Sequence, residues 1–118
     1  MIIKKFEDLI TWQKAQDLAV DIYANFDVNR DFNFKNQICS EVVSISNNIA
    51  EGFDRSSDAD FSRFLYMYLG SASEVRSMLH LAERLKYINM EIKNDLINKV
   101  DEVSKIIRGL IKSLTPKN

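Results

Sequence analysis

Hydrophobic residues recur every three or four positions along most of the chain, which is the spacing of one face of an α-helix. The first such stretch covers residues 8–26, and Asp8 is placed to cap its start. Its apolar side consists of Leu9, Trp12, Ala15, Ala19, Ile22, Tyr23 and Phe26. Residues 28–33 interrupt the pattern, and Asp31 or Asn33 can cap the helix that follows.

The second predicted helix begins near Phe34 and ends near Gly52, because glycine readily adopts the left-handed conformation that closes a helix. Its apolar side consists of Phe34, Ile38, Val42, Ile45, Ile49 and Phe53.

The third predicted helix follows a capping-box pattern, Ser57 with Asp60, and continues to about Lys86. Its main apolar stripe is Phe61, Phe64, Leu65, Tyr68, Ala72, Val75, Leu79 and Ala82. Asn89 can cap the fourth helix. The apolar side of that helix is Leu96, Val100, Val103, Ile107, Leu110 and Leu114.

The connections between these helices are short, and no stretch shows the sustained alternation of a β-strand. The chain has only one proline and three glycines, which suits long helices. Short connections place sequential helices antiparallel to one another. We therefore predict an all-α fold, an antiparallel up-down-up-down four-helix bundle, as a single domain over residues 1–118.

The third helix carries a second apolar stripe, roughly a third of a turn away from the first at 100° per residue. It consists of Met67, Met78, Leu81 and Leu85. One bundle core does not easily bury both stripes, and a second apolar face usually meets another copy of the chain or a partner. We expect self-association through it; the alternative is a broad helix face buried within one bundle.

Polar residues form a ridge beside the core side of the second helix, and small residues precede Glu74 in the run 70–73 of the third. Small side chains let two helices approach closely, and a carboxylate beside a core needs a partner. We expect a polar network or interface made of Gln37, Ser44, Asn48, Glu51, Ser71 and Glu74. A ligand or partner site is the alternative.

Charge does not favour a dedicated nucleic-acid binder, since the formal net charge is -1. Only the segment from residue 86 onward is mildly basic. The candidate RNA contacts there are Lys99, Lys105, Arg108 and Lys112. The alternative is an ordinary solvated helix face.

The residues needed for catalysis are scarce. Cys39 is the only cysteine and His80 the only histidine, and nothing in the sequence links them. A di-iron bundle needs Glu-x-x-His twice, whereas Ser77 stands three residues before His80. The sequence also has no glycine-rich phosphate loop and no paired-cysteine zinc pattern. We expect no catalytic residues, cofactor or metal; an acid/base pair of Glu51 and Glu74 is the last-ranked alternative.

The single cysteine suits a reducing compartment. The first residues lack an apolar run of signal-peptide length, and no stretch approaches 18 uninterrupted apolar residues. We expect a cytoplasmic protein that does not enter a membrane.

Several motifs resemble one family over nearly the whole chain. They are Phe6-Glu7-Asp8-Leu9 with Trp12-Gln13-Lys14-Ala15, then Gln37, Ser44-Ile45 and Asn48-Ile49-Ala50-Glu51-Gly52, and finally Phe61, Phe64 and Gly70-Ser71-Ala72-Ser73-Glu74. This set is similar to the four-helix-bundle family of proteins encoded in intervening sequences of bacterial 23S ribosomal RNA genes. The resemblance implies a bundle that forms closed rings, notably pentamers. Relatives include accessory proteins of reverse transcriptases in diversity-generating retroelements, where a basic ring contacts RNA and the enzyme.

The second helix departs from that family at positions where basic residues are frequent, since Cys39 and Ser40 stand there. This departure weakens a phosphate-contact role for that face. Our lead hypothesis is a non-enzymatic homo-oligomeric scaffold associated with ribosomal RNA or a ribonucleoprotein. The resemblance suggests a pentamer as its form. The alternatives are a direct RNA-binding protein that uses the fourth helix, an accessory subunit of a reverse transcriptase, and last an enzyme.

Overall fold

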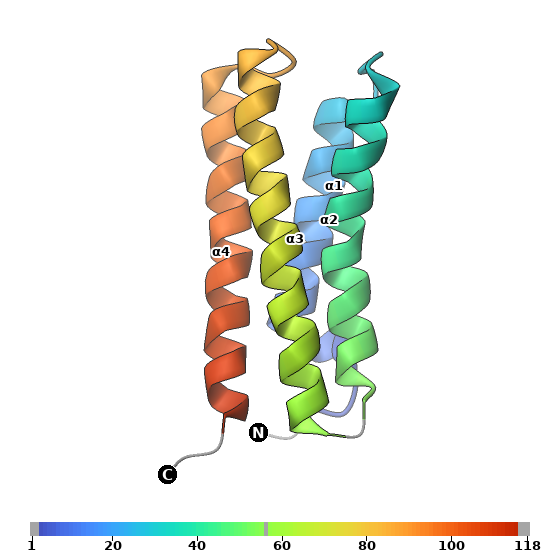
Figure 1. The fold of residues 1–118 in the computed structure, drawn as a ribbon, viewed down its shortest axis with the longest axis vertical. Helices are drawn as coiled ribbons and strands as arrows, with labels where there is room; N and C mark the ends of the chain where they lie inside the picture. Colours follow the sequence, from blue (N-terminus) through green and yellow to red (C-terminus); the bar gives the residue numbers. More distant parts are fainter. Residues whose placement is uncertain (1–2, 56, 116–118) are drawn as a thin grey trace.

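Four long helices account for most of the protein, and the computed structural model describes residues 3–55 and 57–115. A short 3-10 turn, η1 (Phe6–Asp8), comes first. The helices are α1 (Ile10–Phe26), α2 (Phe32–Phe53), α3 (Asp58–Arg84) and α4 (Met90–Leu114). Each runs antiparallel to the next along a bundle of 48 × 23 × 19 Å (Figure 1). The predicted all-α four-helix bundle is confirmed.

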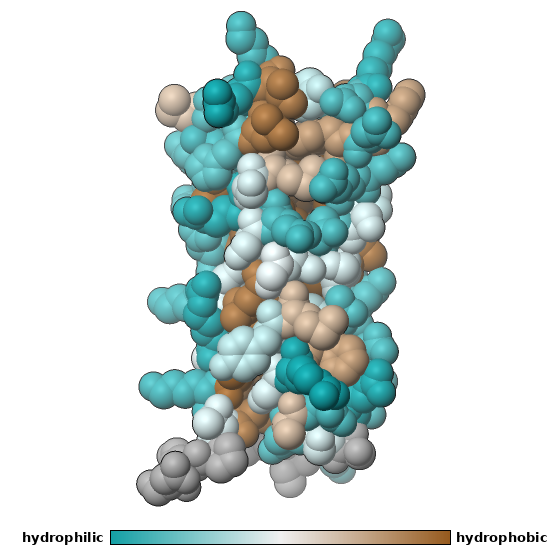
Figure 2. Space-filling view, viewed as in Figure 1, coloured by the Kyte–Doolittle hydropathy of each residue, from teal (hydrophilic) through white to brown (hydrophobic). Residues whose placement is uncertain are grey.

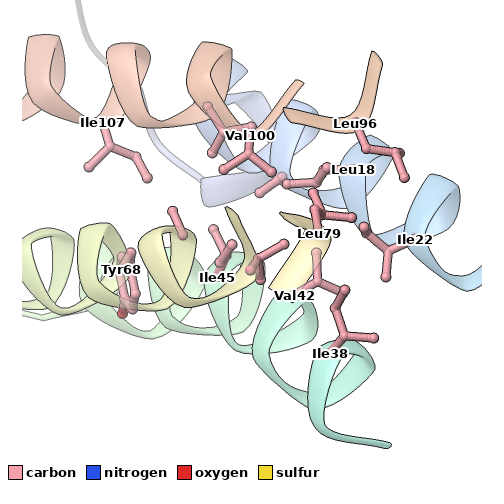
Figure 3. Packing of buried hydrophobic residues seen from close by; sticks show 14 of the residues in the cluster. Leu18, Ile22, Ile38, Val42, Ile45, Tyr68, Leu79, Leu96, Val100 and Ile107 are labelled. Carbon is pink, nitrogen blue, oxygen red and sulfur yellow. The ribbon is translucent and has the colours of Figure 1, made fainter. Parts of the chain in front are cut away.

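Each helix packs against its neighbours in sequence, and α1 also packs against α4, which closes the bundle. Buried apolar side chains from all four helices form one core between them, part of which is seen in Figure 3. Its largest fully buried side chains include Leu18, Ile22, Ile38, Ile45, Ile49, Leu65, Tyr68, Leu79, Leu96 and Ile107. The main stripe predicted for α3 lies in this core, with Phe64 half-buried at its edge.

The buried side of α1 differs from the prediction. Leu18 is 1% exposed, whereas Tyr23 is 46% exposed and Ala19 lies only half-buried. The buried positions follow the spacing Thr11, Ala15, Leu18, Ile22, Phe26, which keeps one narrow side of α1 toward the core. Tyr23 follows Ile22 directly, so it is turned about 100° away from that side.

Three of the four predicted caps are present. Asp31, Ser57 and Asn89 each accept a hydrogen bond from the backbone N–H three residues later, at 3.1, 3.1 and 2.8 Å. The prediction for Asp8 was wrong, because Asp8 lies in the 3-10 turn and α1 begins only at Ile10. Leu9 is the N-cap of α1 and has no capping side chain.

Gly52 does not close α2 by a left-handed turn, since no glycine in the described residues has a positive φ. The helix continues to Phe53, and Gly52 is buried against α3. A Cβ built on Gly52 would lie 2.7 Å from the Cβ of Phe64. Glycine is therefore required there by the close approach of two helices. The left-handed residue is Lys86, with a φ of 64°, just after α3.

Two polar links fix neighbouring elements. Tyr87 donates a hydrogen bond of 2.6 Å to Asp31, which ties the connection after α3 to the start of α2. Gln16 donates one of 3.1 Å to the hydroxyl of Ser46, which joins α1 to α2. None of the helices within the described ranges is long and apolar enough to cross a membrane.

Candidate functional site

A small polar cluster lies between α2 and α3, at the middle of both helices. The hydroxyl oxygens of Ser44 and Ser71 are 3.1 Å apart, and the Ser44 hydroxyl also donates to the carbonyl oxygen of Glu41 at 2.7 Å. Glu74 lies close enough to Glu41 across the same junction to raise the pKa of the Glu41 carboxyl. The structure thus brings Ser44, Ser71 and Glu74 together and adds Glu41.

This arrangement raises the pKa of Glu41. The hydrogen bond with Glu74 is the largest cause, followed by partial burial and by the negative charge of Glu74, while a hydrogen bond from Ser71 lowers the pKa. A like charge this near disfavours the ionised form of Glu41, which is the physical cause of the raised pKa. Neither carboxyl takes part in an ion pair with another described residue.

Glu51 lies apart from this cluster, because ten residues separate it from Glu41, or about 15 Å along a helix. Its carboxylate accepts a hydrogen bond of 2.9 Å from Arg55, one turn further on. The Arg55 guanidinium in turn lies 4.8 Å over the ring of Phe64. Glu51 therefore belongs to a separate ion pair at the end of α2.

Gln37 and Asn48 flank the polar cluster on α2, each four residues from its nearest member. Gln37 is exposed and Asn48 is half-buried. Both lie on the ridge that includes Glu41 and Ser44, since their spacing keeps one side of the helix. They extend the polar ridge along α2 on either side of the cluster.

The Tyr68 hydroxyl, close to Glu51 and Arg55, is fully buried and has no hydrogen-bond partner among the described residues. It points away from α4 (Figure 3). Burial raises the pKa of Tyr68, and the negative charge of Glu51 adds to that effect, with Arg55 opposing it. Sequence spacing placed Tyr68 in the core correctly but could not show that its hydroxyl would lack a partner.

The second apolar stripe of α3 lies on the surface. Met67, Leu81 and Leu85 are 58%, 46% and 45% exposed, and Met78 packs partly against the core. Apolar side chains gather on this face near the end where α3 finishes (Figure 2). The stripe runs beside Ser71 and Glu74 on the same helix, so apolar and polar features share one continuous surface.

The candidate RNA contacts on α4 fall into two groups. Lys99 is bound by Asp21 at 2.7 Å and by Asp95 at 3.2 Å, and its pKa is raised, chiefly by the bond to Asp21. Lys105, Arg108 and Lys112 are exposed and take part in no ion pair among the described residues. Lys99 thus joins α4 to α1, and only the other three candidate cations are without an ion-pair partner among the described residues.

A furrow between α3 and α4 was not foreseen from the sequence. Its residues come from both helices and include Tyr66, Arg76, Asp101 and Arg108. Arg76 and Asp101 pair across it at 3.0 Å. Only the pairing of the two antiparallel helices shows that Tyr66 and Arg108 lie on one furrow, since 42 residues separate them in sequence.

Groups with catalytic potential stay isolated. Cys39 is buried, and burial raises the pKa of its thiol, while His80 is exposed on α3. Within the described part of the chain, no three histidine, cysteine or acidic side chains lie close enough together to hold a metal ion. Of the expected acid/base pair, Glu74 lies beside Glu41, and Glu51 accepts its hydrogen bond from Arg55.

The profile of the 23S rRNA-intervening sequence protein family matches residues 7–109, which is most of the chain. The chain belongs to this family. A crystal structure of a protein with unknown function from the S23 ribosomal protein family, from Bacteroides thetaiotaomicron, is 30% identical in sequence and has a TM-score of 0.81. The alignment covers 87% of this chain and 99% of that one. A comparison with curated proteins gives no match.

Membership of the 23S rRNA-intervening sequence protein family confirms the resemblance drawn from the sequence motifs. The matched residues include all of α1, α2 and α3 and end within α4, after Arg108 and before Lys112. Both the polar cluster and the second apolar stripe lie inside the matched region. The similar crystal structure supports the family and the bundle; its own function is described as unknown.

Proposed function

We propose that this protein is a non-enzymatic, homo-oligomeric scaffold in the cytoplasm, a closed ring of five copies, whose partner is an RNA or a ribonucleoprotein. The observation that carries self-association is the exposed stripe on α3, where Met67, Leu81 and Leu85 are each close to half exposed or more. The ring and its size follow from the family resemblance.

Covering the stripe favours association. Removing one large apolar side chain fully from water contributes roughly 1.5–3 kcal/mol to the free energy of association. Each of the three half-exposed side chains of the stripe therefore contributes part of that amount. The polar cluster beside the stripe adds hydroxyl and carboxyl groups that can fix the register of two copies. A closed ring joins two different patches on each copy, so the stripe would meet a second surface of the neighbouring chain.

The proposal is tested by placing one charge in the stripe. Leu81→Asp is expected to lower the mass measured by light scattering to that of one chain, because a carboxylate buried at an interface without a partner is strongly unfavourable. Val20→Asp is the matched control, since Val20 is 65% exposed on α1, away from the stripe. Circular dichroism checks that both variants keep their helices. If Leu81→Asp keeps the mass of the unmodified protein, the stripe is not the interface.

A further inference from the structure

The furrow between α3 and α4 has the shape of an open trough. It consists of two adjoining hollows, of about 340 and 320 Å³, and Arg108 borders both. One hollow is polar, with Ser73, Arg76 and Ser104 at its walls. The other is lined by Tyr66, Leu69 and Ile111 as well as by cations. A line of apolar atoms between hydrophilic side chains is visible along this face (Figure 2).

The charge along this part of α4 has one sign. Residues 103–115 include Lys105, Arg108 and Lys112 and no acidic residue. None of the three forms an ion pair with a described residue. Arg108 and Lys112 are one helical turn apart, about 6 Å along the axis, and both line the second hollow. Arg108 and Lys112 can therefore contact two neighbouring anionic groups of one extended ligand at the same time.

The negative charge of the acidic residue that lines the furrow is compensated by an ion pair. Asp101 lies at the wall of the first hollow, where the side chain of Arg76 donates to it at 3.0 Å. This pair therefore marks the end of the positive region. The part of the furrow that stays positive is the half bordered by Tyr66, Arg108 and Lys112.

Tyr66 supplies a feature that a bare cationic patch lacks. It is 62% exposed, yet it borders the same hollow as Arg108 and Lys112. An exposed aromatic ring beside cations is the combination with which proteins bind single-stranded nucleic acids, because bases stack on the ring while the cations contact phosphates. A base inside a duplex already stacks on its neighbours and cannot stack on Tyr66 in this way.

We propose that the half-furrow of Tyr66, Arg108 and Lys112 is a binding site for single-stranded nucleic acid. A base stacks on Tyr66, while Arg108 and Lys112 contact successive phosphates. Lys105, one turn before Arg108, extends the positive surface along α4. This site rests on the RNA partner of the proposed function and does not depend on self-association. It excludes Lys99, whose ammonium group is held by Asp21 and Asp95.

The test is fluorescence anisotropy of the full chain with a labelled single-stranded RNA 20-mer, with the DNA strand of the same sequence, and with the RNA duplex. Tyr66→Ala is expected to weaken binding to the single strand about fivefold or more, and Tyr66→Phe to keep it. Arg108→Ala with Lys112→Ala is expected to reduce the slope of log affinity against log salt by about 1.4, or about 0.7 for each phosphate contact.

The matched control is Arg30→Ala with Arg84→Ala, which changes the net charge equally at the opposite end of the bundle. This double variant is expected to keep the affinity and salt slope of the unmodified protein. Comparing the RNA and DNA strands shows whether the 2′-hydroxyl contributes to binding.

The outcomes separate the site from the proposed function. If the unmodified protein binds the single strand and the Tyr66 and Arg108/Lys112 variants bind it equally well, the proposed site is overturned. The RNA partner of the proposed function is then still supported. Equal losses in the two double variants, or binding of the duplex as tight as that of the single strand, also overturn the site. Absence of binding at low salt overturns both the site and the RNA partner. Equal binding of polyglutamate shows that the furrow takes acidic peptides instead.

Discussion

A buried hydroxyl without a partner loses its hydrogen bonds to water and gains nothing in return. The Tyr68 hydroxyl is in this position, while its ring fills the core. We expect Tyr68→Phe to raise the free energy of unfolding, by about 1 kcal/mol, because it removes the unsatisfied group and keeps the ring. Urea unfolding followed by circular dichroism measures the change.

Tyr68→Ala serves as the comparison, with an expected loss of about 3–5 kcal/mol for a large aromatic side chain removed from a core. A loss of stability in Tyr68→Phe would contradict this interpretation, since it would show that the hydroxyl has a partner in solution.

Glu41 couples stability to pH at the polar cluster. Its pKa is raised in the folded protein, chiefly by the hydrogen bond with Glu74. A carboxyl with a raised folded pKa stabilises the fold below its unfolded pKa, and this contribution is lost as pH rises through the folded pKa. Glutamine resembles the protonated carboxyl at every pH. We therefore expect Glu41→Gln to be near neutral at about pH 4 and to become stabilising toward pH 7, where the unmodified protein has lost this contribution.

The quantity to measure is the difference in free energy of unfolding between Glu41→Gln and the unmodified protein across that pH range. Glu102→Gln is the control, because Glu102 forms an exposed pair with Lys14 and should gain nothing as pH rises. A difference for Glu41→Gln that stays constant with pH would show that the pKa of Glu41 is not raised in the folded protein.

At the scale of the helix, the approach of α2 to α3 depends on Gly52. A Cβ there would lie 2.7 Å from the Cβ of Phe64, which is held by its own backbone and cannot swing away. We expect Gly52→Ala to lower the free energy of unfolding by about 1–3 kcal/mol, as overpacking does in other cores. Thermal or urea unfolding measures this loss.

Gly70→Ala is the matched control, since a Cβ at Gly70 would meet nothing within 4 Å. There the greater helix propensity of alanine is expected to stabilise by about 0.5–1 kcal/mol. If the two variants change stability in the same direction, the close approach at Gly52 is not the reason for its glycine.

The helices themselves could be predicted because their signals are local. The caps at Asp31, Ser57 and Asn89 need only a side chain and a backbone N–H three residues away. The core stripe of α3 follows from spacing alone. Features that need a second helix could not be predicted in this way. The reason for Gly52 lies in Phe64, and on α1 Tyr23, predicted on the apolar side, is exposed, while Leu18, left out of that side, is buried.

The candidate site shows the same division. Placing Ser44, Ser71 and Glu74 together required only the ridge on α2 and the small residues on α3. Glu51 was placed with them because it shares that ridge, although ten residues separate it from Glu41; the shared side alone does not show that Arg55 is the closer partner. The furrow residue Tyr66 was missed because its partners are on α4, far along the chain.

For the whole molecule, two surfaces of α3 carry two different roles in this account. We propose the exposed stripe of Met67, Leu81 and Leu85 as the contact between copies, and the furrow beside α4 as the surface for nucleic acid. Because α3 is flanked by α2 and α4, a ring that covers the stripe can leave the furrow of every copy open (Figure 1). Several furrows on one ring would increase the avidity for a long strand.

The central claim is self-association, and native mass spectrometry of the purified chain, after nucleic acid has been removed, tests it most directly. The account predicts one closed oligomer, five copies in a ring, that persists on dilution. Its mass should be a whole multiple of the mass of one chain. A single chain at all concentrations would contradict the account, because the exposed stripe on α3 would then have no partner copy to cover it.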